Sequence, residues 1–83
     1  MVRLNELDDL EAGVVVRLFA TGDMKRRLQD LGVVEGTCIK RLRTSPLGDP
    51  ASYLIRGAVI AIRSCDAYLI GVETVKWDSH LPR

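Results

Sequence analysis

Histidine, cysteine and aromatic residues are all scarce in this sequence. The 83 residues include one histidine, two cysteines, one tryptophan, two tyrosines and one phenylalanine. Cys38 and Cys65 lie far apart and form no CxxC pair, and His80 alone completes no recognised metal-ligand spacing. In a reducing compartment the two cysteines are expected to be buried thiols rather than a disulfide. We therefore predict no metal site and no cofactor, in preference to a metal set built from these three residues.

Sequence motifs that carry catalysis are absent as well. There is no phosphate-binding P-loop, no dinucleotide-binding glycine motif and no HExxH pair. His80 lies in the C-terminal segment, where nothing is expected to hold it against a nucleophile. The carboxylates are scattered through predicted turns, where solvated acids are common. We predict that the protein is not an enzyme.

Long apolar runs and an excess of one charge sign are also missing. The longest apolar run, Ala58 to Ile62, is too short to span a bilayer. The first six residues contain no apolar stretch typical of a secretory signal, so we expect a cytoplasmic protein without membrane insertion. Twelve basic and eleven acidic residues give a net charge of +1. This balance gives no overall electrostatic footprint for nucleic acid, so we predict no nucleic-acid partner.

The sequence does contain enough apolar residues for one small core. Hydrophobic residues make up 47% of the chain, which is typical of a folded globular protein. A chain of this length buries about 60% of its unfolded surface. We expect one domain at residues 1–75 and a C-terminal tail at 76–83.

One short helix is predicted at residues 23–31. Met24, Leu28 and Leu31 are spaced as one stripe of a helix, with Asp23 as a plausible N-cap. Gly32 follows at the position where a helix end requires positive φ, so the helix is expected to stop there. Packing of the apolar stripe must hold so short a helix, which is expected to cover the sheet.

The rest of the chain is predicted to be β structure. Leu4, Leu7 and Leu10 are expected to face the core from a loop or helical turn. Runs rich in β-branched and apolar residues predict five strands and one helical turn, at 14–20, 37–44, 51–56, 58–63 and 68–75, with the turn at 64–67. Ser45–Pro50 contains two prolines, which predict a stiff loop inside a hairpin. Five short strands with one helix after the first strand predict a small β-barrel.

Two features could bind a partner. The run Lys25-Arg26-Arg27 is either a solvated helix face or a docking surface for an acidic partner, and composition alone favours the solvated face. The Pro46–Pro50 loop is either a rigid hairpin turn or a pre-ordered recognition loop, and the residues leave this choice open.

The sequence resembles the FeoA family, small cytoplasmic proteins of bacterial ferrous-iron transport. The resemblance runs from about Leu4 to Val75. It is carried by Leu4, Leu7 and Gly13, then by Met24, Arg26, Arg27, Leu28, Leu31, Gly32, Val33, Gly36 and Thr37, then by Ser45-Pro46-Leu47-Gly48-Asp49-Pro50, and finally by Ala61-Ile62-Arg63 and Asp66-Ala67. It implies an SH3-like β-barrel with a helical insertion and a non-enzymatic accessory role.

The family resemblance also implies a partner, the FeoB membrane transporter with its cytoplasmic GTP-binding domain. The first hypothesis is that the chain docks on FeoB at the inner membrane face. Its contact residues would be Arg26 and Arg27, beside the loop Pro46, Leu47, Gly48, Asp49 and Pro50. Leu28, Leu31, Gly32 and Gly36 would then be architectural.

Two alternatives remain open. The chain could be a regulatory interaction domain, because DtxR-type repressors end in a similar SH3-like domain. In those repressors the domain is attached to a helix-turn-helix part that this sequence lacks. It could also be a metal-binding protein that hands over iron, although Cys38, Cys65 and His80 are poor ligand candidates. The sequence leaves the oligomeric state undetermined.

Overall fold

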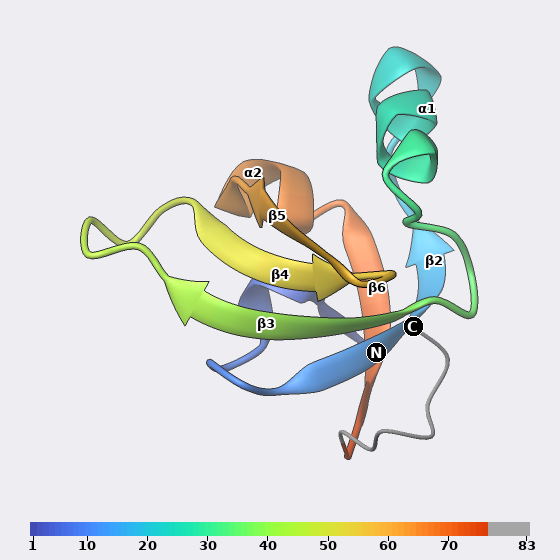
Figure 1. The fold of residues 1–83 in the computed structure, drawn as a ribbon. Helices are drawn as coiled ribbons and strands as arrows, with labels where there is room; N and C mark the ends of the chain where they lie inside the picture. The colour runs from blue at the N-terminus through green and yellow to red at the C-terminus, as the bar shows by residue number, and fades with distance from the viewer. Residues whose placement is uncertain (77–83) are drawn as a thin grey trace.

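Six strands form one antiparallel sheet in the order β1-β6-β2-β3-β4-β5 (Figure 1). The structure is a computed structural model that describes residues 1–76. The elements in chain order are β1 (Val2–Arg3), the 3-10 helix η1 (Leu4–Glu6), β2 (Ala12–Leu18), α1 (Gly22–Asp30), β3 (Cys38–Thr44), β4 (Ala51–Ile55), β5 (Ala58–Ile62), α2 (Ser64–Ala67) and β6 (Ile70–Val75). The predicted mainly β fold is confirmed, and the domain boundary at residue 75 stays a prediction.

The prediction of about five strands misses β1, because two residues carry no readable periodicity. β1 pairs with β6 at one edge of the sheet. The Arg3 guanidinium lies 3.7 Å from the centroid of the Phe19 ring and 4.5 Å from that of Tyr68. Its Nη1 also donates a hydrogen bond of 2.8 Å to the Tyr68 carbonyl. The helix was predicted to follow the first strand. Because β1 precedes β2, α1 instead follows the second strand of the chain.

β2 begins two residues earlier than predicted, because Gly13 lies within the strand and does not bound it. Gly13 faces Val72 of β6 so closely that a Cβ built on it would lie 2.8 Å from the Val72 Cγ2 atom. The glycine therefore permits a close approach of two strands. The register of β2 and β6 shifts between Val15 and Arg17, which marks a bulge.

The sheet curls round one core that η1 closes from the side. The fully buried large side chains come from η1, from four strands and from the segment after α1: Leu4, Val15, Val33, Ile39, Tyr53, Ile55, Ile70 and Val72. Leu4 and Leu7 are buried as predicted. The same prediction is wrong for Leu10, which has φ 69° and is 65% exposed, because it lies in the turn before β2.

The two cysteines differ in exposure. Cys38, at the start of β3, is buried as predicted, and burial raises the pKa of its thiol. Cys65 is exposed, so the prediction of a second buried thiol is wrong. The single turn of α2 directs Ala67 into the core and leaves Cys65 outside.

Helix α1 runs one residue earlier than predicted and does not cover the sheet. Its N-cap is Thr21 rather than Asp23, and no side-chain hydrogen bond caps it. Of the predicted stripe, Leu28 is buried, Met24 is half-buried and Leu31 is 38% exposed. Figure 1 shows that α1 projects from one end of the sheet instead of lying across it.

The C-terminus of α1 ends where the sequence predicts. Gly32 has φ 98°, and its N–H donates to Gln29 O at 2.9 Å. The next N–H, from Val33, donates to Leu28 O at 2.9 Å, which completes a Schellman motif. Val33 and Leu28 are both buried in the core, so this motif fixes the direction in which α1 leaves the sheet.

Candidate partner-binding surface

Arg26 and Arg27 both lie exposed on α1. Neither side chain has an ion pair with any residue in the described range 1–76. Their charges are therefore available to a partner, which agrees with both interpretations of this run. The surfaces next to the two arginines, described below, bear on the choice between these interpretations.

The Pro46–Pro50 loop is ordered by its own backbone. The Gly48 N–H donates to Ser45 O at 2.7 Å, and the Ser45 N–H donates to Pro50 O at 3.2 Å. The peptide bond between Asp49 and Pro50 is cis. Leu47, at the tip, is 93% exposed, which is unusual for a large apolar side chain. The predicted stiffness of the loop thus has a hydrogen-bonded basis.

Asp49 ties this loop to α2. Its Oδ1 accepts a hydrogen bond of 2.8 Å from the Ser64 N–H, and its Oδ2 accepts one of 3.4 Å from Ser64 Oγ. The carboxylate is therefore already engaged within the chain. Pro46, Leu47, Gly48 and Pro50 are also exposed.

The structure does not bring the two predicted contact regions together. Figure 1 places α1 and the β3–β4 loop at opposite ends of the molecule. The loop was expected to lie beside Arg26 and Arg27, but it lies far from the helix that carries them. A single partner would have to span the whole protein to contact both regions at once.

A groove of about 400 Å³ lies between α1 and the corner where β5 meets α2. Sequence reasoning missed it, because its two walls come from separate parts of the chain, residues 24–31 and residues 61–66. It is lined by five apolar and three charged residues: Met24, Leu28, Leu31, Ala61 and Ile62, with Arg27, Arg63 and Asp66. Arg27 is thus the member of the predicted pair that borders a concave surface.

Arg56, in the turn between β4 and β5, packs against the C-terminus of α1. A Cβ built on Gly32 would lie 2.9 Å from the Arg56 Cδ atom. The Arg56 side chain therefore covers Gly32, and its charge lies near the negative end of the helix dipole. This contact joins α1 to the β4–β5 hairpin.

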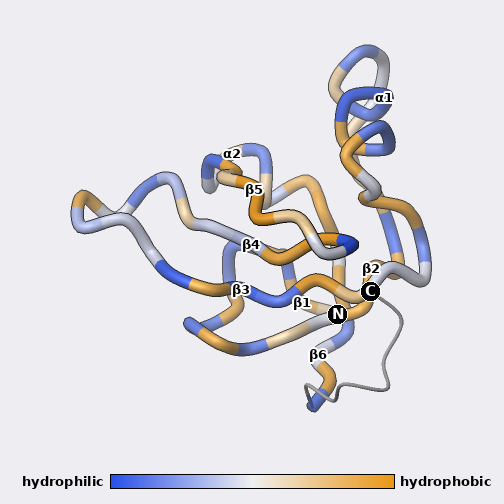
Figure 2. The backbone as a smooth tube through the Cα atoms, viewed as in Figure 1, coloured by the Kyte–Doolittle hydropathy of each residue, from blue (hydrophilic) through white to orange (hydrophobic). Residues whose placement is uncertain are grey.

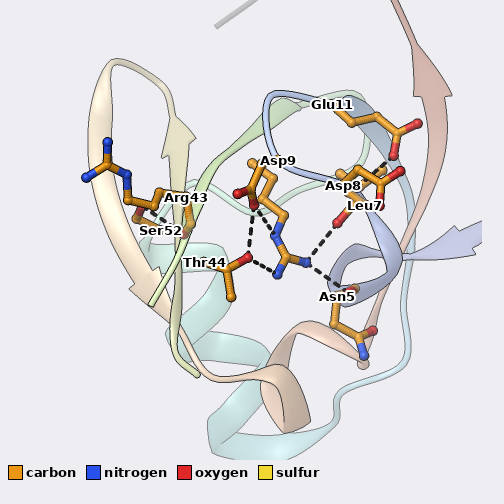
Figure 3. A network of polar contacts seen from close by, with 9 residues as sticks. Asn5, Leu7, Asp8, Asp9, Glu11, Arg43, Thr44 and Ser52 are labelled. Atoms are coloured by element: carbon orange, nitrogen blue, oxygen red, sulfur yellow. Dashed lines mark hydrogen bonds and ion pairs between the residues drawn. The ribbon is translucent and has the colours of Figure 1, made fainter. Parts of the chain in front are cut away.

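A second hollow, of about 600 Å³, is lined by residues 5–9 together with Arg41 and Thr44 of β3. Figure 3 shows the polar contacts of this region. Arg41 Nη1 donates to Asn5 O at 3.0 Å and to Leu7 O at 2.8 Å. Its Nη2 donates to Thr44 Oγ1 at 2.7 Å, and its Nε lies 3.4 Å from Asp9 Oδ1. The guanidinium thus fastens the segment before β2 to β3, and these contacts are structural.

The Arg41 guanidinium lies 5.9 Å from the centroid of the Tyr53 ring. Burial raises the pKa of the Tyr53 phenol, against the opposing influence of Arg41, so this group stays neutral at physiological pH. Across residues 1–76, no three His, Cys, Asp or Glu side chains are grouped so that they could hold a metal ion. His80 lies outside the described residues, so the metal set that includes it is not tested.

Comparison with known proteins identifies the family of this chain. The sequence model described as the FeoA domain matches residues 2–74. The chain belongs to the FeoA family. A fusion of Fe(2+) transport protein A with the Fe(2+) transporter FeoB in Porphyromonas gingivalis is 34% identical over 74 residues. That match covers 89% of this FeoA chain but only 9% of the fusion protein.

Solved structures show the same fold. FeoA from Chlorobium tepidum has a TM-score of 0.84 and 34% identity, covering 99% of this chain and 78% of its own. Zinc-complexed FeoA from Stenotrophomonas maltophilia is described as a prokaryotic SH3 domain protein. It has a TM-score of 0.77 and 26% identity, and the match covers 88% of this chain and 91% of that protein. A manganese-dependent transcriptional repressor scores 0.80 at 24% identity, with coverage of 88% and 36%, which shows the fold alone. The predicted SH3-like barrel is confirmed.

No helix within residues 1–76 has the length and apolar character needed to cross a membrane. The described residues expose three candidate binding surfaces: the arginines of α1, the tip of the β3–β4 loop and the groove.

Proposed function

We propose that this FeoA-family chain is a non-enzymatic accessory protein of ferrous-iron uptake that docks on the cytoplasmic part of a FeoB-type transporter. The single observation that carries the proposal is the Porphyromonas gingivalis relative, in which transport protein A and FeoB form one chain. Fusion holds two parts at high effective concentration. A separate FeoA-type chain has to reach the transporter through a binding surface.

The α1 side of the molecule is the proposed primary contact. Arg26 and Arg27 are exposed without ion pairs in the described range, so they can steer an acidic partner surface and meet it without first breaking an internal bond. Arg27 also borders the groove, where apolar contacts would add to the charge attraction.

The β3–β4 loop is the proposed second contact. Its internal hydrogen bonds and the Asp49 anchor order it before binding, which lowers the entropy lost on association. Pro46, Leu47 and Gly48 would contact the partner, whereas Asp49 and Pro50 would hold the loop in shape. Since the loop lies far from α1, it would meet a different part of the transporter.

Reversing both helix arginines, Arg26→Glu with Arg27→Glu, is expected to weaken binding to the purified FeoB-type transporter of the same organism at least about tenfold. The melting curve followed by circular dichroism should shift by no more than about 2 °C, because neither arginine has an internal partner. Biolayer interferometry at physiological ionic strength measures the affinity.

Lys76→Glu is the matched control for Arg26→Glu alone. Lys76 is also exposed, and it follows β6 at the opposite end of the molecule from α1 (Figure 1). The single reversal on α1 should weaken binding by several-fold and the reversal at Lys76 by less than twofold. Equal effects of the two variants would show that α1 is not the contact.

The second candidate function is a regulatory interaction domain, supported by the repressor that shares this fold. It is the weaker proposal, because that likeness concerns the fold only and this chain has no helix-turn-helix among its described elements. We expect no salt-dependent shift of duplex DNA at low-micromolar protein, and such a shift would favour this second function.

A further inference from the structure

β5 lies at one edge of the sheet, and its outer side has no partner strand among residues 1–76. The turn that joins it to β4 has φ 50° at Arg56 and 81° at Gly57, the signature of a two-residue hairpin. In such a hairpin the residues that flank the turn, Ile55 and Ala58, form the first hydrogen-bonded pair. Hydrogen-bonded pairs then alternate along the ladder.

This alternation decides which backbone groups of β5 point outward. Ile60 and Ile62 direct their N–H and C=O groups to β4, in register with Tyr53 and Ala51. Val59 and Ala61 direct theirs to the free edge. None of these four outward groups has a hydrogen-bond partner elsewhere in residues 1–76. The edge therefore offers two donors and two acceptors to another strand.

β5 lacks three of the features that commonly protect an edge strand, namely charged residues, proline and a bulge. Its sequence, Ala-Val-Ile-Ala-Ile, contains no charge and no proline, and its register with β4 runs without a bulge. Val59 is 66% exposed. Figure 2 shows hydrophobic residues along β5, next to a hydrophilic turn. An unprotected apolar edge of this kind is a template for strand addition.

The groove beside α1 extends this edge. Ala61, one of the two outward-pointing positions, lines the groove together with Met24 and Leu31 of α1. Leu31 is 38% exposed, so apolar surface on the helix faces the same opening. A strand added to β5 would gain backbone hydrogen bonds on one side and apolar contacts with α1 on the other.

Charge decides which strand fits. Arg56 lies at one end of β5, Arg63 lies at the other, and neither has an ion pair in the described part of the chain. A second copy of β5, added antiparallel in the register that uses all four outward groups, would bring Arg63 of one copy beside Arg56 of the other at both ends. Like charges at these positions disfavour self-association. Carboxylates at the ends of a foreign strand would meet both arginines favourably.

We propose that the β5 edge receives an extended segment of a partner protein that alternates apolar side chains and carries carboxylates at both ends. The segment adds a strand beside β5, its backbone pairs with Val59 and Ala61, and its acidic ends meet Arg56 and Arg63. The identity of the partner as the transporter rests on the proposed function, whereas the site itself rests on the geometry of β5.

The test is a titration of the ¹⁵N-labelled chain with a seven-residue peptide that alternates valine and threonine between terminal aspartates. The amide signals of Val59 and Ala61 should shift saturably, because their N–H groups gain partners. A control peptide with terminal lysines should bind at least about fivefold more weakly, as expected for two exposed ion pairs. Shifts confined to another surface, or equal binding of the two peptides, would overturn the proposal.

Val59→Pro removes one outward N–H without removing a bond of the β4 ladder, so the fold should survive and peptide binding should be lost. Val59→Thr keeps that N–H and should retain binding. Arg63→Glu provides an independent test. It should weaken binding of the peptide with terminal aspartates and strengthen binding of the peptide with terminal lysines. Unchanged affinities in Arg63→Glu, or a dimer that Val59→Pro dissociates, would contradict the assignment of an acidic foreign strand.

Binding of the transporter separates this inference from the proposed function. Loss of both peptide and transporter binding in Val59→Pro supports the two together. A transporter that binds the wild-type chain and Val59→Pro equally well overturns the β5 site as the docking edge and leaves the proposed function intact. If the chain binds the peptide as expected but does not bind the transporter, the proposed function is overturned and the β5 site is supported.

Discussion

Replacing Arg41 by alanine is expected to lower the free energy of unfolding by about 3 kcal/mol. The substitution leaves the carbonyls of Asn5 and Leu7 without their donor and removes the contacts to Thr44 and Asp9. The side chain of Arg41 is 12% exposed, so water replaces few of these bonds. In a domain of this size the melting temperature should fall by roughly 12–24 °C. Urea denaturation followed by circular dichroism measures the loss.

Two further variants separate the geometry of Arg41 from its charge. Arg41→Lys keeps the charge but replaces a planar fork with a single ammonium group, so it should recover less than half of the lost stability. Asp9→Asn should cost less than about 1 kcal/mol, because Asp9 is 53% exposed and its ion pair is solvated. A fully stable Arg41→Ala variant would show that the network does not hold the segment before β2 to the sheet.

Gly13→Ala is expected to cost about 2 kcal/mol through overpacking. The added Cβ would lie 2.9 Å from the Val72 Cβ and 3.2 Å from the Glu73 carbonyl oxygen. Val72 is fully buried and the carbonyl belongs to β6, so neither neighbour can move without shifting the strand. Thermal melting should show a loss of roughly 8–16 °C.

Gly71→Ala is the matched control for this crowding effect. Gly71 also lies in a strand without positive φ, but its added Cβ would meet the Met1 Sδ and the edge of the Phe19 ring. Met1 is 57% exposed and flexible, so it can move aside. The expected cost is less than about 1 kcal/mol. If the two variants lose equal stability, the close approach of β2 and β6 is not what Gly13 permits.

Much of the fold could be predicted from local patterns. The β-branched runs between glycines and prolines gave the positions of the long strands, and Gly32 gave the end of the helix. Residues whose place depends on contacts distant in sequence were mispredicted. β1 pairs with β6, and Arg3 stacks on Phe19 and donates a hydrogen bond to the Tyr68 carbonyl, but no periodicity in two residues reveals this. Leu31 fits a helical stripe but is 38% exposed.

The candidate site was predictable in part. Exposure of Arg26 and Arg27 follows from their positions off the apolar stripe, and the stiffness of the β3–β4 loop follows from its prolines. The groove was not predictable, because its walls combine α1 with residues 61–66 only after the chain has folded. The run Ala58–Ile62 shows the same limit. From sequence it served only to exclude a membrane span, while its role as an unprotected edge depends on the order of strands in the sheet.

The proposed docking draws on three exposed features of the described residues. They are the arginine pair of α1, the ordered tip of the β3–β4 loop and the apolar β5 edge beside the groove. Exposed arginines and open strand edges are common in surfaces that recognise other proteins. The polar network around Arg41, in contrast, is used internally.

The most direct test of the proposed docking is the equilibrium binding of the full chain to the detergent-purified FeoB-type transporter of the same organism. We expect saturable binding of one chain per transporter with an affinity in the micromolar range, as is typical of transient interfaces. Binding should weaken in Arg26→Glu with Arg27→Glu, and binding of the wild-type chain should weaken as the salt concentration is raised. If the folded chain shows no binding at concentrations up to roughly millimolar, the chain does not dock on the transporter.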